Sequence, residues 1–248
     1  IEYGVKGPTF ATCSACSTAT HAIGIARDYI ENGLIDVAIA GASESVINYG
    51  PRTAWQALHE LSPEGCFPFA KKRNGTVLGE GAGILVIEEY EHAKARGATI
   101  LAELCGYGMT SDSKDMVNPD IEGPRVAMQL ALEDAGLEPS DIEYLNAHGT
   151  ATAINDKNET NAIKEVYGDH AYKLAISSTK SMHGHPLGAG GGIEAVACIK
   201  AINEGWVPPT AGLDEADPDC DLDYVPNVGR DQRESYAKCN SFALGGRH

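Results

Sequence analysis

The sequence predicts an α/β fold built around a mainly parallel sheet. Short apolar runs alternate with amphipathic stretches of helical period along most of the 248 residues, which is typical of strands connected by helices. Polar, glycine-bearing motifs follow the strands or precede the helices, where parallel sheets place ligands. With 43% hydrophobic residues, the chain can bury a sizeable core.

The first helix and the first two strands follow a segment that contains two cysteines. Apolar residues at helical spacing predict a helix at 17–32, and Gly33 provides its C-terminal stop. Two short, mainly apolar runs, 34–41 and 83–88, predict buried strands. This order places Cys16 directly before a helix that leads into the sheet.

A short helix, a strand and a longer helix are expected in the middle of the chain. The stretch 89–96 ends at Gly97 and predicts the short helix, and the apolar run 100–106 predicts a third strand. A proline near its start and Gly136 just after its end delimit the longer helix at 123–135.

The last part of the chain continues the alternation. The run 142–146 predicts a strand, 156–167 a helix, 174–177 a strand, and 186–203 a long helix with proline at its start. Two further strands are expected at 221–225 and 236–242. Strands that alternate with helices favour parallel pairing, because each helix returns the chain to the same end of the sheet.

Charge and cysteine content exclude several classes of protein. The net charge of −16 repels nucleic acid and anionic membranes, and the basic run 71–73 is too short to overcome it. No apolar run approaches the roughly 18 to 20 residues that cross a bilayer, and we expect no signal peptide. Seven cysteines in a chain of this length favour reduced thiols. We therefore expect a cytoplasmic protein that binds neither nucleic acid nor membranes.

Cys16 is the strongest candidate for a nucleophile. It lies between the small residues Ala15 and Ser17, at the start of the first expected helix. Backbone N–H groups at a helix start stabilise a thiolate, so we expect a lowered pKa for this thiol. The alternatives are a buried structural cysteine and a redox or half-zinc pair with Cys13 in a Cys-x-x-Cys motif. The pair ranks lower because no second cysteine pair accompanies it.

Two later histidines complete the outline of a thiol active site. His148 and His185 each lie beside a glycine, so a backbone or a ligand can approach them closely. Lys180 would stabilise negative charge in a dry pocket, and Glu194 is its expected partner. Structural histidines and an ordinary surface ion pair are the alternatives. A metal site that uses His183 is disfavoured, because the sequence offers too few ligands beside it.

Two glycine clusters admit different interpretations. Gly245 and Gly246 could bring backbone N–H groups to the cysteine and form an oxyanion hole. The glycine-rich run 188–192 lacks the Lys-Ser/Thr of a phosphate-binding loop, so close helix packing is the better interpretation.

The candidate residues belong to motifs that run along nearly the whole chain. The motifs are Ala15-Cys-Ser17 with His21, 77–83, 88–94, Asn146-Ala-His-Gly-Thr150, 180–185, 207–210, 220–224 and 240–246. On these motifs the chain resembles the condensing enzymes of fatty-acid and polyketide synthesis. It is most similar to 3-oxoacyl-(acyl-carrier-protein) synthase II and to the ketosynthase subunits of type II polyketide systems.

The resemblance implies the thiolase-like fold, in which two related halves stack as αβαβα layers. Residues 1–88 would form the end of the N-terminal half with the nucleophile, and residues 89–248 would form the C-terminal half with the histidine and lysine motifs. We expect a fragment that lacks the N-terminal part of the first half and the last strand. Such proteins are usually homodimers, or heterodimers with a chain-length factor.

The resemblance also implies the roles of the reacting groups. Cys16 would take an acyl chain from acyl carrier protein, and the backbone N–H groups of Cys16 and Leu244 would form the oxyanion hole. His148 and His185 would stabilise the enolate that forms as malonyl carrier protein loses carbon dioxide. Lys180 would set the electrostatics around the two histidines.

Three supporting residues follow from the same resemblance. Glu194 would hold the lysine, and Thr150 and Thr152 would line the path of the carrier's phosphopantetheine arm. No metal and no bound cofactor are implied, because the phosphopantetheine belongs to the carrier protein.

Several positions depart from the family pattern. Leu244 stands where the gating loop usually has phenylalanine, which would change gating or chain-length preference. Arg247 and His248 replace Thr-Asn, which would weaken the support of the oxyanion loop. Further departures are expected to affect loop structure or carrier affinity: Ala70, Asn74, Asp115 and Val117.

Three other functions compete with a condensing acyltransferase. A chain-length or initiation partner subunit would lack the nucleophile, whereas Cys16 is present. A docking scaffold for the carrier protein would be non-catalytic. A degradative thiolase would need a reactive Cys-x-Gly near the end, whereas Cys239 precedes Asn240-Ser241. The sequence therefore predicts a 3-oxoacyl-ACP synthase that performs a decarboxylative Claisen condensation in fatty-acid or polyketide biosynthesis.

Overall fold

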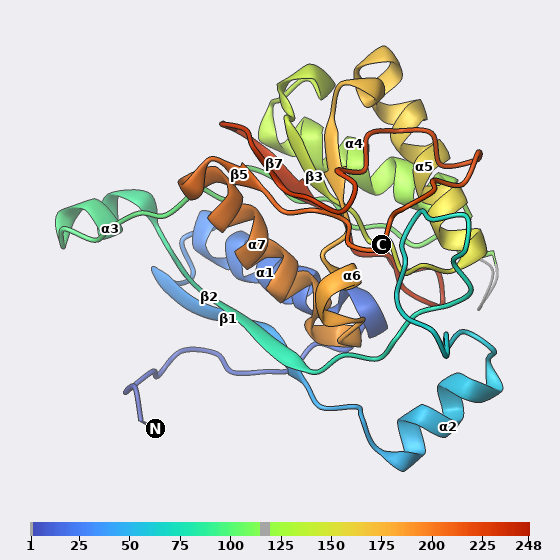
Figure 1. Cartoon of the computed structure of the whole chain (residues 1–248). Coiled ribbons are helices and arrows are strands. Elements are labelled where there is room, and N and C mark those ends of the chain that lie inside the picture. Colours follow the sequence, from blue (N-terminus) through green and yellow to red (C-terminus); the bar gives the residue numbers. More distant parts are fainter. Residues whose placement is uncertain (1, 115–119) are drawn as a thin grey trace.

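The computed structural model describes residues 2–114 and 120–248 (Figure 1). Its helices are α1 Thr18–Glu31, α2 Tyr49–Ala57, α3 Tyr90–Ala95, α4 Glu122–Ala135, α5 Ala153–Tyr167, α6 Lys180–His183 and α7 Gly190–Glu204. Its strands are β1 Val37–Glu44, β2 Gly81–Glu88, β3 Tyr144–Asn146, β4 Ala175–Ser177, β5 Trp206–Val207, β6 Arg230–Asp231 and β7 Ala237–Cys239.

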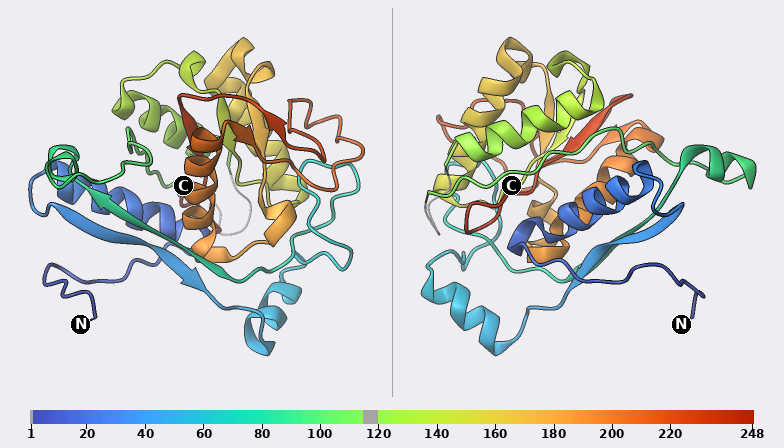
Figure 2. Two further views of the ribbon diagram at one scale, coloured as in Figure 1. Left: turned by 60° about the vertical axis from the view of Figure 1, so that its left-hand side comes forward. Right: turned by 180° about the vertical axis from the view of Figure 1, so that it is seen from behind.

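The layers alternate between sheets and helices (Figures 1 and 2). The β1–β2 sheet is antiparallel, and α1 and α7 lie side by side on one of its faces. On the other side of α7 lies a sheet of order β4-β3-β7, whose strands are all parallel. Helices α4 and α5 cover the far face of this second sheet (Figure 2). The prediction of parallel pairing is confirmed for this sheet, and β1–β2 and β5–β6 are antiparallel.

The parallel sheet is buried on both faces because its side chains alternate between two apolar clusters. Leu145 and Ile176 pack in the cluster that includes Ile163 of α5. Their strand neighbours Tyr144 and Ala175 belong to a second cluster on the α7 side. Burial of each large aliphatic side chain stabilises the fold by about 1.5–3 kcal/mol.

Glycines allow α7 to lie directly against β2. A Cβ atom on Gly83 would lie 2.0 Å from the carbonyl carbon of Gly192, and a Cβ on Gly192 would lie 2.3 Å from the carbonyl oxygen of Gly83. No side chain fits at either position. This contact confirms that the glycine-rich run 188–192 serves close helix packing.

The strand expected at 34–41 is shifted and is not buried. Strand β1 runs from Val37 to Glu44, and its outward-facing Ile39 is 53% exposed beside Val86 of β2, which is 67% exposed. The apolar run was interpreted as a strand covered on both faces. In the structure, helices cover one face only.

Two further strand predictions were wrong. The run 100–106 is extended but pairs with no strand in the described chain, and Arg27 and Asn203 bond its carbonyl groups at Leu104 and Leu101. The run 221–225 makes only single backbone bonds, from Ile176 N–H to the carbonyl oxygen of Asp223 for example. An apolar run becomes a strand only where a neighbour completes a ladder of hydrogen bonds.

The predicted helices are confirmed within a few residues, apart from 186–203, which begins as a 3-10 turn at Leu187–Ala189 before α7. The strand expected at 236–242 is also shorter than predicted, because β7 ends at Cys239. Helices α2 and α6 were missed.

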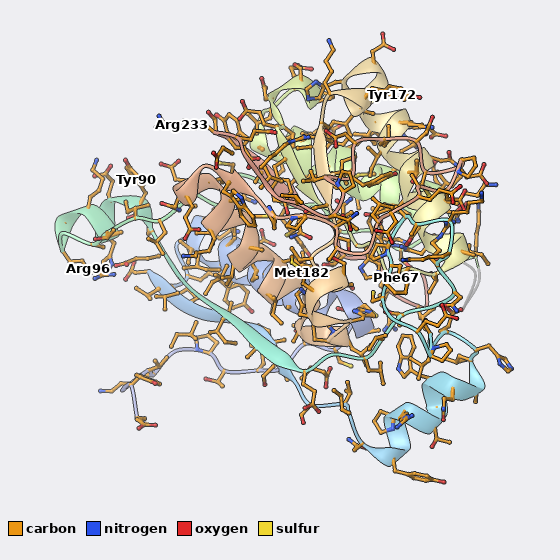
Figure 3. All side chains as sticks on the ribbon, in the orientation of Figure 1. Phe67, Tyr90, Arg96, Tyr172, Met182 and Arg233 are labelled. Atoms are coloured by element: carbon orange, nitrogen blue, oxygen red, sulfur yellow. The ribbon has the colours of Figure 1, made fainter. Side chains whose placement is uncertain are left out.

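Helices α2 and α3 project from the layers (Figure 2). Tyr90, which begins α3, and Arg96, which follows its end, lie outside the layered body (Figure 3). Among the helices of the described residues, none has the length and apolar character needed to cross a membrane.

Candidate active site

Cys16 lies in a tight turn that leads directly into α1. The 3-10 turn Ala15–Ser17 contains Ala15 at φ 52°, a left-handed conformation that costs a non-glycine residue about 1 kcal/mol or more. Ser17 Oγ donates a hydrogen bond to the Ser14 carbonyl oxygen at 2.8 Å, which fixes the turn. The Cys16 side chain is only 5% exposed. The prediction that this cysteine directly precedes a helix is confirmed.

His185 contacts the cysteine directly, with its Nε2 atom 3.1 Å from Cys16 Sγ. Its backbone is held by the segment before β2, because its N–H donates to Val77 at 2.7 Å and Gly79 N–H donates to its carbonyl oxygen at 3.0 Å. A Cβ on Gly79 would lie 2.3 Å from the His183 carbonyl oxygen, so only glycine allows this approach. Gly184, the glycine beside this histidine, also packs against the segment, so the close backbone approach expected from the sequence is confirmed.

His148 lies beyond the end of β3, next to His185. The two ring centroids are 5.4 Å apart and the ring planes meet at 86°. Burial holds the pKa of both imidazoles well below the ordinary range, and the Lys180 cation lowers both further. Both rings are therefore neutral at pH 7, so each has one N–H donor and one nitrogen acceptor.

Glu159 on α5 holds the turn that carries His148. Its Oε1 and Oε2 atoms accept hydrogen bonds from the N–H groups of His148 and Gly149, each at 2.8 Å, and Asn240 Nδ2 donates to Oε1 at 3.1 Å. Burial raises the pKa of the Glu159 carboxyl to about 7. Sequence reasoning missed this residue, because a single acidic residue within a helix resembles an ordinary surface position.

Replacement of Glu159 by alanine is expected to lower the free energy of unfolding by about 3 kcal/mol or more, since several buried donors lose their acceptor. Glu159→Gln keeps one acceptor oxygen and should lie between the alanine variant and wild type. Urea titration followed by circular dichroism measures the change. The control is Glu165→Ala on the exposed side of the same helix, and an equal effect of both alanine variants would contradict the positioning role.

Lys180 and Glu194 form an ion pair behind the two histidines, and both side chains are 0% exposed. Lys180 begins α6, and Glu194 lies in the first turns of α7. The prediction that these residues pair is confirmed, and the alternative of a surface pair is wrong. Burial raises the pKa of the Glu194 carboxyl, and the lysine opposes this effect.

The thiol of Cys16 does not have the lowered pKa that we expected. Burial raises it to about 12, and this effect exceeds the opposing influence of Lys180 and of the N–H groups of Leu244 and Cys16. We expected the helix start to lower the pKa of this thiol. The loss of water around the thiolate raises the pKa by more than the helix start lowers it. The resting cysteine is therefore a thiol, and His185 Nε2 is the nearest group that can accept its proton.

The loop that carries Leu244 closes over the cysteine. Gly245 and Gly246 have φ values of 84° and 64°, which favour glycine, and the Leu244 N–H points to the thiol. Ala243 N–H donates to the Arg247 carbonyl oxygen at 2.8 Å. These contacts place a backbone donor where an oxyanion hole would need one.

Arg247 and His248 do not leave this loop unsupported, contrary to expectation. The backbone of His248 exchanges hydrogen bonds with Thr110 at 3.0 and 3.1 Å. The ring of His248 is buried, with Nε2 lying 3.3 Å from Asp112 Oδ2. The substituted residues therefore dock the loop on the segment before α4.

A cavity of about 290 Å³ is lined by Cys16 and the catalytic candidates around it. Its lining includes both histidines, the loop that carries Leu244, and the predicted Thr150 and Thr152, whose hydroxyl oxygens are 3.1 Å apart. Trp55 on α2 also borders it, with its ring centroid 6.2 Å from that of His185. This tryptophan was missed because α2 was not predicted.

The remaining candidates lie beside or outside the cavity. Ala70 is buried away from it, and Asn74 borders it from a loop, where it accepts a hydrogen bond from Ser62. Asp115 and Val117 lie outside the described residues. Cys13 is exposed while Cys16 is buried, which disfavours a shared redox or zinc site. Within the described ranges, no cluster of histidine, cysteine and acidic side chains suits a metal ion.

Two family models match most of the chain. The N-terminal domain of beta-ketoacyl synthases matches residues 1–93, and the C-terminal domain matches residues 101–214. Nodulation protein E of Rhizobium leguminosarum bv. trifolii is 53% identical over 246 residues, which are 99% of this chain and 61% of that protein. The 3-oxoacyl-[acyl-carrier-protein] synthase 2 of Staphylococcus aureus (strain COL) is 47% identical over 253 residues, with the same coverage of 99% and 61%.

Solved structures agree with these matches. A type II polyketide ketosynthase, in complex with its acyl-carrier protein and bound to the hexaketide, is 39% identical with a TM-score of 0.97, covering 100% of this chain and 63% of that chain. A beta-ketoacyl synthase from Burkholderia phymatum STM815 is 43% identical with a TM-score of 0.91, covering 95% and 59%. The present chain thus spans 61% of the length of the curated relatives it matches and has the thiolase-like fold of the ketosynthases. The chain belongs to the beta-ketoacyl synthase family.

Proposed function

We propose that the full-length protein is a 3-oxoacyl-ACP synthase of fatty-acid or polyketide biosynthesis. The observation that carries this proposal is the contact of Cys16 Sγ with His185 Nε2 at 3.1 Å, with His148 next to it at one cavity. A thiol, two neutral imidazoles and a backbone donor are the groups that acyl transfer and enolate stabilisation require. A non-catalytic chain-length partner would not need the thiol–imidazole contact.

In the first half-reaction, Cys16 Sγ attacks the thioester carbonyl of acyl carrier protein. His185 Nε2 accepts the thiol proton, and the N–H groups of Cys16 and Leu244 stabilise the oxyanion. The carrier thiol leaves with a proton, and the acyl group remains on Cys16 as a thioester.

In the second half-reaction, malonyl carrier protein enters and loses carbon dioxide. In this step the proton of neutral His185 is on Nε2, so His148 and His185 both donate N–H bonds to the thioester oxygen. The electron pair of the broken C–C bond is thereby held as an enolate. The enolate carbon attacks the acyl-Cys16 carbonyl, and the C–S bond breaks. Cys16 leaves as a thiolate and takes one proton from water, and the product carries two more carbons on the carrier.

Partners and cofactors follow from this chemistry. We propose acyl carrier protein as the partner, and the resolved complex of a similar ketosynthase with its carrier supports this choice. Thr150 and Thr152 border the path for the phosphopantetheine arm, which the carrier brings, so we propose no resident cofactor. A dimer and a cytoplasmic location remain part of the proposal.

The basic run 71–73 is not a free dock for the carrier. Its three cations pair with acidic residues of one segment: Lys71 with Glu215, Lys72 with Asp214, and Arg73 with Asp217.

The direct test supplies the full-length protein with a fatty acyl carrier protein and malonyl carrier protein. We expect a 3-oxoacyl carrier protein two carbons longer than the starter, with one carbon dioxide released per product, as measured by mass spectrometry. Carbon dioxide without a longer chain would contradict the condensation, and so would acyl transfer to water.

Removal of the Lys180 charge should shift the pH profile of Cys16 acylation, because His185 accepts the thiol proton only while its ring is neutral. Because this cation lowers the pKa of both histidines, Lys180→Met together with Glu194→Gln should raise those pKa values. The histidines then become protonated at higher pH, so the rate begins to fall at a higher pH than in wild type. The paired change avoids the loss of about 3–5 kcal/mol that an unpaired buried charge would cause. An unmoved acid limb would contradict the electrostatic role.

A further inference from the structure

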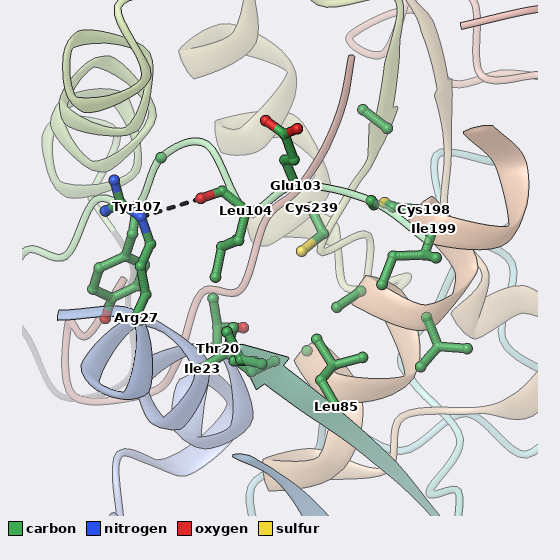
Figure 4. Close-up of a pocket in the computed structure, with 18 of the residues that line it drawn as sticks. Thr20, Ile23, Arg27, Leu85, Glu103, Leu104, Tyr107, Cys198, Ile199 and Cys239 are labelled. Carbon is green, nitrogen blue, oxygen red and sulfur yellow. Dashed lines mark hydrogen bonds between the residues drawn. The ribbon is translucent and has the colours of Figure 1, made fainter. Parts of the chain in front are cut away.

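A second, larger cavity does not reach the reacting groups. It has a volume of about 1050 Å³ and lies between α1, β2, α7 and the extended run 100–106, where Arg27 donates to the Leu104 carbonyl oxygen (Figure 4). Among the described residues that line it are neither Cys16 nor the two histidines next to it. The approach to the thiol therefore depends on the residues around the smaller cavity of about 290 Å³.

Two segments that are far apart in the sequence meet along this smaller cavity. One is 74–76, before β2, and the other is 150–155, which leads into α5. Gly75 N–H donates to the Ala151 carbonyl oxygen at 3.0 Å. Ala151 has φ 65°, a left-handed conformation that persists in a non-glycine residue only where surrounding contacts impose it. The shape of the segment 150–155 therefore depends on contacts with other parts of the chain.

Arg73 supplies such contacts, although it does not itself line the cavity. Its Nε and Nη2 atoms donate to the carbonyl oxygens of Thr152 and Ala153 at 3.4 and 3.2 Å. Its Nη1 atom donates to the Ala70 carbonyl oxygen at 3.1 Å, within the loop that continues into 74–76. A guanidinium group presents its N–H donors in a rigid plane, so these three bonds fix the two segments relative to each other.

Two carboxylates hold the guanidinium group in this position. Asp156 Oδ2 lies 3.7 Å from Arg73 Nε, and Asp217 Oδ2 accepts a hydrogen bond from Nη1 at 2.6 Å. The side chains of Arg73 and Asp156 are 5% and 0% exposed, so water and salt screen their attraction only weakly. A cation at the start of α5 opposes the helix dipole, and the carboxylates offset this repulsion. Arg73, Asp156 and Asp217 thus form a largely buried clamp.

Lys72, the neighbour of Arg73, differs from it in both exposure and partners. Its side chain is 44% exposed and pairs with Asp214, whose side chain is 70% exposed. Surface pairs of this kind contribute little to stability, and Lys72 has no bond to either segment along the cavity. Of the two adjacent cations, Arg73 alone connects the segments.

We propose that Arg73, held by Asp156 and Asp217, is a positioning residue for substrate entry: it aligns the segment that carries Thr150 and Thr152 with the segment 74–76. The reacting groups have other supports, since Glu159 holds the turn of His148. Loss of the clamp should therefore weaken binding of the carrier's arm more than it slows the chemical steps. The identity of the arm rests on the proposed condensing function, whereas the clamp itself does not.

Arg73→Lys tests the clamp in the full-length protein. The lysine keeps the charge beside both carboxylates but cannot donate to three carbonyl groups from one plane. We expect KM for malonyl carrier protein to rise about five- to tenfold, with kcat within about twofold of wild type. Lys72→Ala is the matched control and should change neither constant. An unchanged KM, or a kcat that falls as far as kcat/KM, would overturn the proposal.

Asp217→Asn provides a second variant that does not bury an unpaired charge, because its side chain is 23% exposed and Asp156 remains beside the guanidinium group. Its KM should lie between those of wild type and Arg73→Lys. If Arg73→Lys does not fold, as judged by circular dichroism, Asp217→Asn decides the question. A KM equal to that of wild type in this variant would then overturn the proposal.

Alkylation of Cys16 separates this inference from the proposed function. A carrier protein whose pantetheine arm ends in a bromoacetyl group should alkylate the thiol with loss of bromide, and iodoacetamide should do so without an arm. Arg73→Lys should slow the first reaction about five- to tenfold at low carrier concentration and leave the second unchanged, as measured by intact mass. Equal slowing of both reactions, or of neither, would overturn the proposal. Wild type that the carrier alkylates but that forms no 3-oxoacyl product would contradict the condensing function alone.

Discussion

Full-length protein in which Cys16 is replaced by alanine should take up no acyl group from acyl carrier protein. Wild type should gain the mass of one acyl chain less one hydrogen, because the thioester forms at this thiol. The overall condensation should fall by at least about a thousandfold, since among the described residues no other cysteine lines the cavity. This variant has the largest expected effect, because the covalent intermediate cannot form without the sulfur.

The measurement is the intact mass of the protein after incubation with acyl carrier protein, followed by peptide mapping of the adduct. Cys105→Ala is the matched control, because Cys105 is exposed and lies on the extended segment, away from the cavity. The control should load at the rate of wild type. Equal loading of Cys16→Ala and wild type would show that the nucleophile is elsewhere.

His148→Ala should separate the two half-reactions. Acylation of Cys16 should survive, because His185 and not His148 contacts the sulfur. Release of carbon dioxide from malonyl carrier protein should fall by at least about a hundredfold, since one of two donors to the enolate oxygen is lost.

Radiolabelled carbon dioxide from malonyl carrier protein measures the second half-reaction, and the acyl adduct on the protein measures the first. His92→Ala is a suitable control, because the His92 side chain is 47% exposed on α3, a helix that projects from the layers. If His148→Ala releases carbon dioxide as fast as wild type, the enolate role of His148 is wrong. If it also loses acylation, the two half-reactions are not separated as proposed.

Local sequence was sufficient for most helices and for the main site residues. Apolar spacing with glycine and proline at the ends located α1, α4 and α5 within a few residues, because these signals act within one or two helical turns. Family motifs identified Cys16, His148, His185 and the Lys180–Glu194 pair, whose contacts the structure contains. The boundary between halves at residues 88 and 89 stays a prediction.

Strand pairing was predicted less well from local sequence, because a strand depends on a partner that is distant along the chain. The runs 100–106 and 221–225 have strand-like composition, yet neither obtains a ladder of backbone bonds in the described chain. The run 34–41 looked buried on both faces, whereas the exposed side chains of Ile39 and Val86 show cover on one face only. Helix α2 was missed, and none of its residues is buried.

The sequence by itself determined the fold class, most of the helices and the identity of the reacting side chains, because these depend on residue type and short-range spacing. Only the tertiary structure decided the electrostatics and the supporting contacts. Burial outweighs the effect of the helix start and raises the pKa of Cys16 to about 12. Glu159 and His248 hold the catalytic loops through contacts between distant segments. Desolvation and long-range hydrogen bonds depend on what surrounds a group in space, and neighbours along the chain do not specify that environment.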